Sequence, residues 1–416
     1  MSIESLRIAM LSVHTSPLAT LGGKKTGGMN VYVRELSRQL GRDDLIVDIY
    51  TRCYQDPPPS STITAINDHV RVIHLPAGPN GPLSGEEIYP YLQDFAQAIL
   101  DFATSEDLHY DLIHSHYWLS GLVAETLRDH WNVPFIQMFH TLGQMKNRIT
   151  TDINEHVGQV RIDGEYQIMR SADHLVAATP AERIQMMWLY GADMKKITII
   201  PPGVDLNHFC PMPKREARHA VGVDESQRLL LFVGRIEKLK GIDTLLQAVS
   251  LLRENMPGEQ AKITVSIVGG DPDNPDYIDE ETRRLKKLHQ DLGLTDLVTF
   301  LGAKSQDTLH YYYSAAEIVV MPSHYESFGM VALEAMACGT PVVASEVGGL
   351  AYLIQNGITG FHVPDQEPEP LAESLQILLT NLDLRMEMSS AAINHVQKYA
   401  WPLITERIRN LYNRVI

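Results

Sequence analysis

The sequence has little cysteine and no long apolar run, and both shortages exclude classes of protein. Its three cysteines, Cys53, Cys210 and Cys338, lie far apart without a CxxC spacing, which argues against a disulfide framework and a structural zinc site. The apolar runs are far shorter than the roughly 18 to 20 residues of a membrane span, and residues 1–7 lack a signal-peptide pattern. We therefore expect a soluble, cytoplasmic protein with reduced cysteines.

Positive charge is also scarce. The chain has 35 Lys and Arg against 51 Asp and Glu, so that its formal net charge is −16. Nucleic acid and anionic lipid are themselves negatively charged, so such a chain has little nonspecific affinity for either. We expect no nucleic-acid partner and no strong membrane association, and an anionic ligand must be bound by a local group of cations.

What the sequence does contain is an alternation of strand-like and helical segments that runs through the chain twice. In the first half, apolar runs such as 6–13 and 110–116 alternate with helical patterns, which is typical of a parallel sheet covered by helices. The alternation restarts at about residue 228, after a proline-rich interval at about 201–213 that interrupts strands and helices and serves as a linker. We expect two doubly wound α/β domains with a cleft between them, at the carboxyl ends of their strands.

The segment YESFGMVALEAMACGTPVV, residues 325–343, predicts a buried helix that contains a carboxylate. Ser327 is a candidate helix cap, Gly339 marks the helix end, and the residues of the predicted helix, about 328–338, are apolar on every face. Glu334 within this helix needs partners, because burying an unpaired carboxylate is costly. The candidates are backbone amides, an Arg or Lys, or the hydroxyls of a ligand, and a structurally satisfied core Glu is the alternative.

The segment FVGRIEKLKGID, residues 232–243, places Arg235 and Lys240 between an apolar strand and a helix. Sheets of this kind bind ligands at the ends of their strands, where two cations can hold a diphosphate and stabilise the negative charge on a departing phosphate. A solvated basic loop is the alternative. The glycine-rich segment GGKKTGGMN, residues 22–30, precedes the first helix and indicates more weakly a phosphate or sugar contact.

Two strand ends in the first half, HSHYW and FHT, carry polar side chains. No carboxylate near them completes a zinc spacing such as HExxH, so a metal site is not favoured. Neutral His, Tyr and Thr side chains donate and accept hydrogen bonds, which suits a polyhydroxylated substrate. We expect four of these side chains to line the cleft: His116, Tyr117, His140 and Thr141.

Together, the segments SVHTSPL, TGGMNVYV, YDLIHSHYWLSG, PPGVDLNHF, FVGRIEKLKGID and ESFGMVALE resemble the retaining glycosyltransferases of family four, which have the GT-B fold. The resemblance spans nearly the whole chain. The N-terminal segments look most like the enzymes that glycosylate an inositol phosphate, and next like sucrose-phosphate synthases. The resemblance implies a retaining hexosyltransferase that takes a nucleotide-diphosphate sugar, expected to be a UDP-sugar, as co-substrate and needs no metal or other cofactor. A homodimer would fit it too.

The resemblance also implies a division of the chain. Residues 1–205 would form an N-terminal, acceptor-binding Rossmann-like domain, and residues 206–395 a C-terminal, nucleotide-sugar-binding one, the two facing an interdomain cleft. Residues 396–416 would form a helix that crosses back to the N-terminal domain. An ordinary last helix of the second domain fits the sequence equally well.

Residue by residue, the resemblance implies a donor site in the second half. Arg235 and Lys240 would neutralise the diphosphate, and Glu334 would bind the ribose hydroxyls. Glu326 would face the transferred sugar, which His140 would contact from the acceptor side. The backbone at Ser327, Phe328, Gly329, Met330 and Val331 would complete the donor site, and Gly28 would close over the phosphates. The implied catalytic residues are therefore His140, Arg235, Lys240 and Glu326.

The implied acceptor site is in the first half and comprises Asn30, Tyr117, Thr141 and Arg161. The acceptor is expected to be a small soluble hydroxyl compound, such as a phosphorylated cyclitol or sugar. One phosphate-binding Lys of the inositol-phosphate enzymes is not matched, because Gly85 stands at about its position; Lys24, Lys146 and Arg148 are candidate substitutes. Transfer to fructose 6-phosphate and mannosyl transfer to a lipid are the alternatives, and the acidic composition counts against the lipid.

Overall fold

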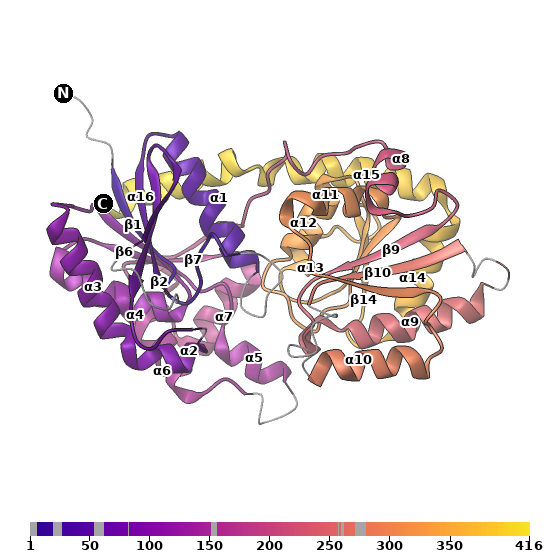
Figure 1. The fold of residues 1–416 in the computed structure, drawn as a ribbon, viewed down its shortest axis with the longest axis horizontal. Coiled ribbons are helices and arrows are strands. Elements are labelled where there is room, and N and C mark those ends of the chain that lie inside the picture. The colour runs from indigo at the N-terminus through magenta and orange to yellow at the C-terminus, as the bar shows by residue number, and fades with distance from the viewer. Residues whose placement is uncertain are drawn as a thin grey trace. The chain divides into compact units, whose positions relative to one another are not determined.

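The computed structural model describes residues 6–19, 27–53, 62–81, 83–150, 156–256, 258, 262–270 and 280–416. The chain divides into two compact units (Figure 1). The first contains Gly28–Pro202 and Trp401–Ile416 together with the described residues before Thr20, and the second contains Gly203–Ala400. Each unit has its own sheet and its own hydrophobic core. The predicted pair of doubly wound α/β domains is thereby confirmed.

The first unit is built on an eight-stranded sheet in the order β3-β4-β2-β1-β5-β6-β7-β8. Its strands are β1 (Arg7–Leu11), β2 (Ile46–Cys53), β3 (Thr62–Asn67), β4 (Val70–Pro76), β5 (Leu112–His116), β6 (Phe135–Met138), β7 (His174–Ala177) and β8 (Ile197–Ile199). All neighbouring strands are parallel except β3 and β4. The turn at residues 68–69 is too short for a crossover, so it can join β3 to β4 only as an antiparallel pair.

Helices cover this first sheet. They are α1 (Gly28–Arg42), α2 (Gly85–Ile88), α3 (Leu92–Ser105), α4 (Trp118–Trp131), α5 (Gly143–Ile149), α6 (Gln159–Ser171), α7 (Pro180–Tyr190) and α16 (Trp401–Val415), with 3₁₀ turns at Tyr89–Tyr91 and Met194–Lys196. Helix α1 packs against α16, and α4 packs against α3 and α6 on the other side of the sheet (Figure 1). The sheet therefore lies in the middle of three layers, as its apolar strands require.

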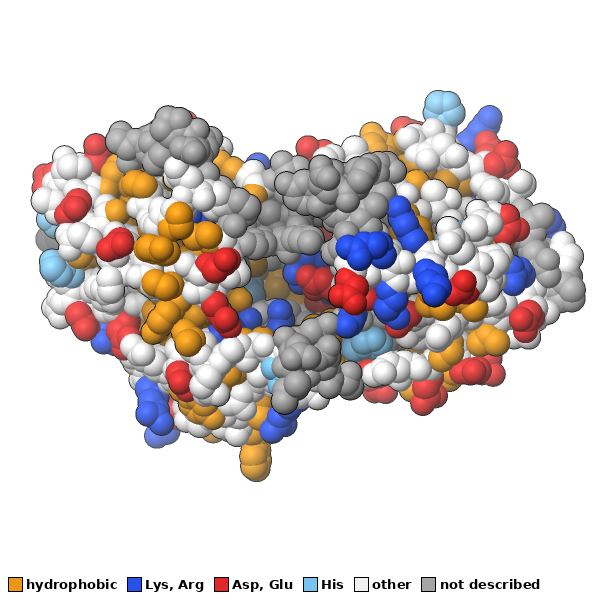
Figure 2. All heavy atoms as spheres, turned by 60° about the horizontal axis from the view of Figure 1, so that its bottom comes forward, with side chains coloured by type: hydrophobic (Ala, Val, Ile, Leu, Met, Phe, Trp, Pro, Cys, Tyr) orange, Lys and Arg blue, Asp and Glu red, His pale blue; other side chains and the backbone are white. Residues whose placement is uncertain are grey.

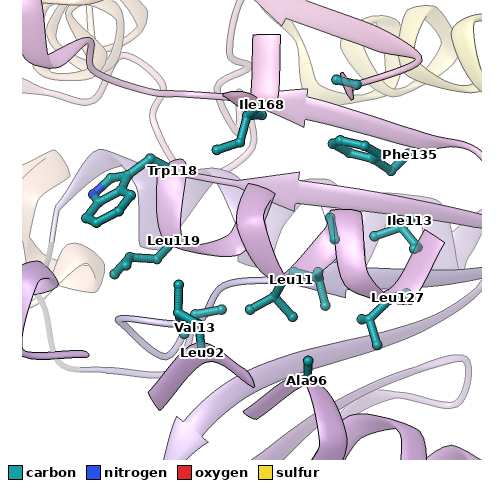
Figure 3. Close-up of a cluster of buried hydrophobic side chains, with 14 of the residues drawn as sticks. Leu11, Val13, Leu92, Ala96, Ile113, Trp118, Leu119, Leu127, Phe135 and Ile168 are labelled. Atoms are coloured by element: carbon teal, nitrogen blue, oxygen red, sulfur yellow. The ribbon is translucent and has the colours of Figure 1, made fainter. Parts of the chain in front are cut away.

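The core of the first unit fills the space between the strands and α3, α4 and α6. Figure 3 shows Leu11, Ile113 and Phe135 from the strands facing Leu127 of α4 and Ala96 of α3. Each of these side chains is almost or completely buried. Burial of a large apolar side chain contributes roughly 1.5–3 kcal/mol, so this cluster supplies much of the stability that holds the strand ends in place.

The second unit is built on a six-stranded, entirely parallel sheet in the order β11-β10-β9-β12-β13-β14. Its strands are β9 (Arg228–Val233), β10 (Ile263–Val268), β11 (Val298–Gly302), β12 (Ile318–Met321), β13 (Val342–Ser345) and β14 (Gly360–Val363). Its helices are α8 (Lys214–Val221), α9 (Ile242–Asn255), α10 (Glu280–Asp291), α11 (Gln306–Ala315), α12 (Met330–Ala337), α13 (Leu350–Leu353), α14 (Pro368–Thr380) and α15 (Leu382–Val396), with 3₁₀ turns at Lys238–Lys240 and Gln397–Tyr399. Helix α9 packs against α10 and α14, and α12 packs against α11 and α15.

The last helix, α16, makes its contacts within the first unit. The Tyr412 hydroxyl lies 2.7 Å from Nδ1 of the buried His114. The Arg407 guanidinium donates to the Ile199 carbonyl at the end of β8, and Arg409 pairs with Asp43 just after α1. The chain thus returns to the first unit at Trp401.

The surface carries mixed charge. On the face of the second unit that Figure 2 shows, Lys and Arg side chains lie among Asp and Glu side chains. Among the ion pairs of this unit are those of Arg284 of α10 with Glu281 and Asp243. Among the described residues, no helix is both long enough and apolar enough to cross a membrane. The three cysteines are free thiols.

Candidate functional site

Each sheet has a point at which the chain reverses its direction of travel across the strands. In the second unit this point lies between β9 and β12, because β9 leads to β10 on one side and β12 leads to β13 on the other. In the first unit it lies between β1 and β5. The loops that follow these strands run to opposite faces and leave a crevice at the carboxyl ends, where sheets of this kind bind ligands.

Both predicted cations of the second unit lie in the loop after β9, and both are ion-paired. Arg235 Nη1 lies 2.5 Å from Glu237 Oε1. Lys240 Nζ lies 2.5 Å from Oε2 of Glu326, which comes from the loop after β12. The structure thus brings the predicted residues Lys240 and Glu326 together across the switch point. Both pairs keep some contact with water, Arg235–Glu237 more than Lys240–Glu326, so a diphosphate can compete with these carboxylates for the cations.

A glycine pair after β13 fixes the backbone of Glu326. The Gly349 N–H donates to the Glu326 carbonyl over 2.8 Å. Gly348 has a φ of 46°, and a Cβ at this position would lie 2.0 Å from the same carbonyl oxygen. Only glycine permits so close an approach. This pair was not predicted, although two adjacent glycines lie two residues after an apolar strand in the sequence.

Helix α12 begins later than the sequence predicts. Its first residue is Met330, and its N-cap is Gly329, with a φ of 106° and no side-chain cap. The predicted start at residue 328 and the cap by Ser327 are therefore wrong, because a helix cannot pass through a residue in the left-handed region. A Cβ on Gly329 would lie 2.7 Å from Leu350, so packing requires glycine here. The predicted helix end is confirmed by Gly339, with a φ of 79°.

Glu334 is buried in α12, with 5% of its surface exposed. Its Oε2 accepts a hydrogen bond from the Tyr313 hydroxyl over 2.7 Å, and its Oε1 accepts one from the Gln306 amide over 3.3 Å. Both of these partners come from α11. Burial and the Glu334 charge raise the pKa of Tyr313 well above its usual value, so the phenol remains a donor. Helix α11 thus orients the carboxylate.

In the first unit, His140 follows β6 and contacts a buried neighbour. Its Nε2 lies 3.0 Å from Nδ1 of His116, and the Tyr32 ring packs edge-on 5.3 Å away. Burial lowers the pKa of His140 to about 3, so the imidazole is neutral at physiological pH. His116 itself is completely buried, with its Nε2 on Met10 Sδ. The expectation that His116 lines a cleft is therefore wrong, because as the last residue of β5 it points under Tyr32 of α1.

Three predicted acceptor residues form one hydrogen-bonded cluster. The Arg161 guanidinium, on α6, donates to the Tyr117 hydroxyl over 2.9 Å and to the Thr141 carbonyl and hydroxyl over 2.9 and 3.1 Å. Its Nε donates to Glu165 one turn later, over 2.7 Å. Arg161 is 4% exposed, so this pair is buried. Glu165 was not predicted, although its spacing of four residues from Arg161 on a helix is a recognisable signal.

Two further predicted positions of the first unit, Asn30 and Gly28, lie in the first turn of α1. Asn30 is buried and donates to the Thr15 hydroxyl and the Ser16 carbonyl over 2.7 and 2.8 Å, which fixes the loop after β1. Gly28 is the first residue of α1. Lys24 lies outside the described residues, as does most of the glycine-rich segment that contains it.

Gly85 begins the short helix α2, which Ser84 caps. A Cβ added to Gly85 would lie 3.7 Å from Trp118 and from Leu119. These contacts are ordinary van der Waals distances, so a longer side chain has room to start here. Lys146 and Arg148, which are candidates to replace the phosphate-binding Lys that this chain lacks, lie on α5 after Thr141.

No group of three or more His, Cys, Asp or Glu side chains is placed to hold a metal ion in the described part of the chain. At the switch point of the second unit, the polar groups are cations that pair with carboxylates. At the switch point of the first unit, they are neutral rings and hydroxyls around a buried Arg. Cations bind phosphates, and hydroxyl and imidazole groups bind sugars or other polyols.

Two family models match consecutive parts of the chain. Residues 26–208 match the model of "Glycosyltransferase Family 4", and residues 213–395 match that of "Glycosyl transferases group 1". The chain belongs to glycosyltransferase family four, with the GT-B fold, and is a retaining hexosyltransferase.

Particular relatives are similar over nearly the whole chain. A D-inositol 3-phosphate glycosyltransferase from Geodermatophilus obscurus is 41% identical over 397 residues, which are 95% of this chain and 86% of the relative. The structure of a sucrose-phosphate synthase from Thermosynechococcus elongatus superposes with a TM-score of 0.89 at 34% identity, covering 98% of each chain. Anabaena HepE in complex with UDP and glucose has a TM-score of 0.73 at 20% identity, covering 98% of this chain and 100% of HepE. The likeness to HepE concerns the fold alone.

Proposed function

We propose that this enzyme transfers a hexose from a UDP-sugar to a hydroxyl of a small phosphorylated polyol, with an inositol phosphate as the first candidate acceptor. The observation that carries the proposal is the Arg161 cluster, in which one buried guanidinium and two hydroxyl-bearing residues, Tyr117 and Thr141, converge. This combination suits a phosphate monoester, which accepts several charge-assisted hydrogen bonds. The relative from Geodermatophilus obscurus, which is named for an inositol phosphate, supports the choice.

In this proposal the donor diphosphate replaces the carboxylates that pair with the two cations of the second unit. Arg235 leaves Glu237, and Lys240 leaves Glu326. The carboxylate of Glu326 is then available to accept hydrogen bonds from the hydroxyls of the transferred sugar. Glu334, oriented by α11, accepts hydrogen bonds from the ribose hydroxyls, while the backbone around residues 327–331 approaches the donor. HepE, which has the same fold, is described in complex with UDP and glucose, in agreement with such a donor.

The proposed reaction takes place on one face of the sugar. The bond between the anomeric carbon and the diphosphate oxygen breaks, the acceptor oxygen forms the new bond on the same face, and the leaving phosphate oxygen takes the acceptor proton. The two cations stabilise the charge that grows on the diphosphate, and this electrostatic term can dominate the rate enhancement. His140 is neutral, so it can hold a sugar hydroxyl without adding charge where the oxocarbenium character develops.

A second candidate acceptor is fructose 6-phosphate. The sucrose-phosphate synthase from Thermosynechococcus elongatus supports it, with 34% identity. Gly85 also bears on this choice, because it replaces a Lys expected of the inositol-phosphate enzymes. Inositol phosphate and fructose 6-phosphate both carry a phosphate, and the Arg161 cluster could bind the phosphate of either acceptor.

The test is a nucleotide-release assay of the purified full-length chain. UDP-glucose, UDP-N-acetylglucosamine, ADP-glucose and GDP-mannose are crossed with inositol phosphate, fructose 6-phosphate and unphosphorylated sugars. We expect UDP release that depends on one phosphorylated acceptor. Release with neutral acceptors alone would overturn the phosphate site at Arg161.

A variant of Gly85 sharpens this test. Gly85→Lys adds a cation, so it should lower the KM for the phosphorylated acceptor about threefold through one additional charge-assisted contact. Gly85→Met is the matched control, since it adds similar length without charge and should leave this KM unimproved. An equal effect of both substitutions would mean that the position lies away from the phosphate.

A further inference from the structure

A histidine and a carboxylate pair at the same strand edge as Lys240 and Glu326. His324 follows β12, and Asp365 follows β14, two strands further along the sheet. The Nδ1–H of His324 donates to Asp365 Oδ1 over 2.7 Å. Both side chains are partly exposed, at 15% and 27%. Neither residue has a role in the proposed reaction described above.

The backbone of His324 is joined to the turn that carries Lys240. The His324 N–H donates to the Leu239 carbonyl over 2.9 Å. Gly241, which follows Lys240, has a φ of 63°, and a Cβ there would lie 1.9 Å from the Pro322 carbonyl oxygen and 3.3 Å from His324 Cε1. The turn therefore lies directly against the segment 322–324, with no space between them.

The same segment leads directly to Glu326. The Glu326 backbone is held by Gly349, and its side chain pairs with Lys240. In the Lys240–Glu326 pair, the loop after β13 thus fixes the position of Glu326. The position of Lys240 depends on the contact between His324 and the turn that carries Lys240. Asp365 accepts a hydrogen bond from the His324 ring, whose Cε1 lies beside Gly241, and so holds this ring in one orientation.

We propose that His324, oriented by Asp365, is a positioning residue for Lys240, which it holds where the diphosphate of the donor binds. The inference rests on the proposed function in taking a nucleoside diphosphate as the ligand. His324 acts through Lys240 rather than on the reacting atoms. A long, flexible Lys side chain gains most from such support, because its entropy opposes any single position.

The experiment measures UDP binding to the full-length chain by calorimetry. We expect His324→Ala to weaken UDP binding about fivefold and Lys240→Ala to weaken it about twentyfold, the range of one charge-assisted contact. If His324 acts through Lys240, the double variant binds UDP no more weakly than Lys240→Ala alone. His324→Asn, which can still donate to Asp365, should stay within about twofold of the wild type.

Two controls separate positioning from folding. His69 lies near Asp44 in the first unit, with 3.9 Å between His69 Nδ1 and Asp44 Oδ1, so His69→Ala removes a comparable surface histidine and should leave UDP affinity unchanged. Thermal unfolding of each variant reports stability independently. A lower Tm for His324→Ala with wild-type UDP affinity would overturn the proposal, as would penalties that add in the double variant.

The same measurements distinguish failure of the inference from failure of the proposed function. A wild type that binds UDP but transfers sugar to none of the acceptors would overturn the proposed function. In that case, the coupling between His324 and Lys240 in UDP binding would still show whether His324 positions Lys240. A wild type that transfers sugar but has no such coupling would overturn the inference alone.

Discussion

The polar groups at the strand edges of the two units differ in how deeply they are buried and in how they are paired. In the first unit, His140 is half-buried and neutral, and Arg161 is buried and ion-paired with Glu165. In the second unit, Arg235 and Lys240 are partly exposed, and their partners are single carboxylates. The first edge therefore keeps its cation in a buried ion pair, whereas the second holds cations whose partners can be exchanged.

This difference follows from the cost of desolvation. A charge taken out of water needs a permanent partner, so breaking a buried pair is expensive, whereas a pair that remains in contact with water contributes little. Loss of the buried ion pair in the first unit should accordingly reduce stability as well as acceptor binding, whereas loss of a cation in the second unit should act mainly on donor chemistry. Four variants test this contrast.

The largest effect is expected for Arg161→Met. The substitution leaves Glu165 buried without its cation, which should lower the free energy of unfolding by about 3 to 5 kcal/mol. Denaturant unfolding measures the change. The double variant Arg161→Met/Glu165→Gln is the control and should recover much of the loss; no recovery would mean that the pair is not what stabilises α6.

Arg235→Ala should behave in the opposite way. It removes a cation that the proposed mechanism uses at the leaving diphosphate, so turnover should fall roughly 100-fold or more. The Tm should change little, because Arg235 pairs only at the surface. Steady-state kinetics and a thermal scan give both numbers. Near-normal turnover would refute the role of Arg235, and a large fall in Tm would remove the contrast with Arg161.

Glu334→Ala probes a residue of the second unit that is buried like those of the first. We expect the KM for the donor to rise about tenfold, because a charge-assisted contact to the ribose is lost. Tyr313→Phe is the control, since it removes only the phenol that orients Glu334, and its effect on KM should be smaller. Unchanged donor affinity with lost stability would mean that Glu334 is a core residue without a ligand.

The smallest effect concerns Glu182, a buried carboxylate at the start of α7. Its Oε2 accepts from the Ala178 N–H, its Oε1 is buried without a partner, and burial raises its pKa to about 7. A carboxyl whose folded-state pKa is raised contributes stability that is complete below its unfolded-state pKa and is lost as pH rises through 7. Unfolding free energy should therefore fall by about 1 kcal/mol between pH 6 and pH 8 through this group.

Glu182→Gln removes this titration. The variant should lack that part of the pH dependence, as measured by denaturant unfolding at pH 6 and pH 8. A wild type and variant with parallel pH profiles would show that Glu182 is ionised throughout this range.

Local sequence predicted well those features that depend on neighbours along the chain. Apolar runs located β1, β5 and β9, and glycine located the end of α12, since strand burial and helix termination are short-range properties. The start of α12 was missed because the apolar helical pattern runs through residue 328, whereas Gly329 adopts a left-handed conformation that the pattern does not reveal. His116 was misplaced because residue type does not reveal that Tyr32 covers it.

The sequence by itself determined the class of fold, the family, and the residue types at the strand ends, because periodicity and motif spacing are written along the chain. Only the tertiary structure decided the partners of those residues. In the structure, Tyr313 donates a hydrogen bond to Glu334, and Lys240 pairs with Glu326. Arg161 donates hydrogen bonds to Tyr117 and Thr141. The reason is physical: a buried or half-buried polar group is satisfied by whatever the sheet order brings beside it, and sheet order joins segments that are far apart in sequence.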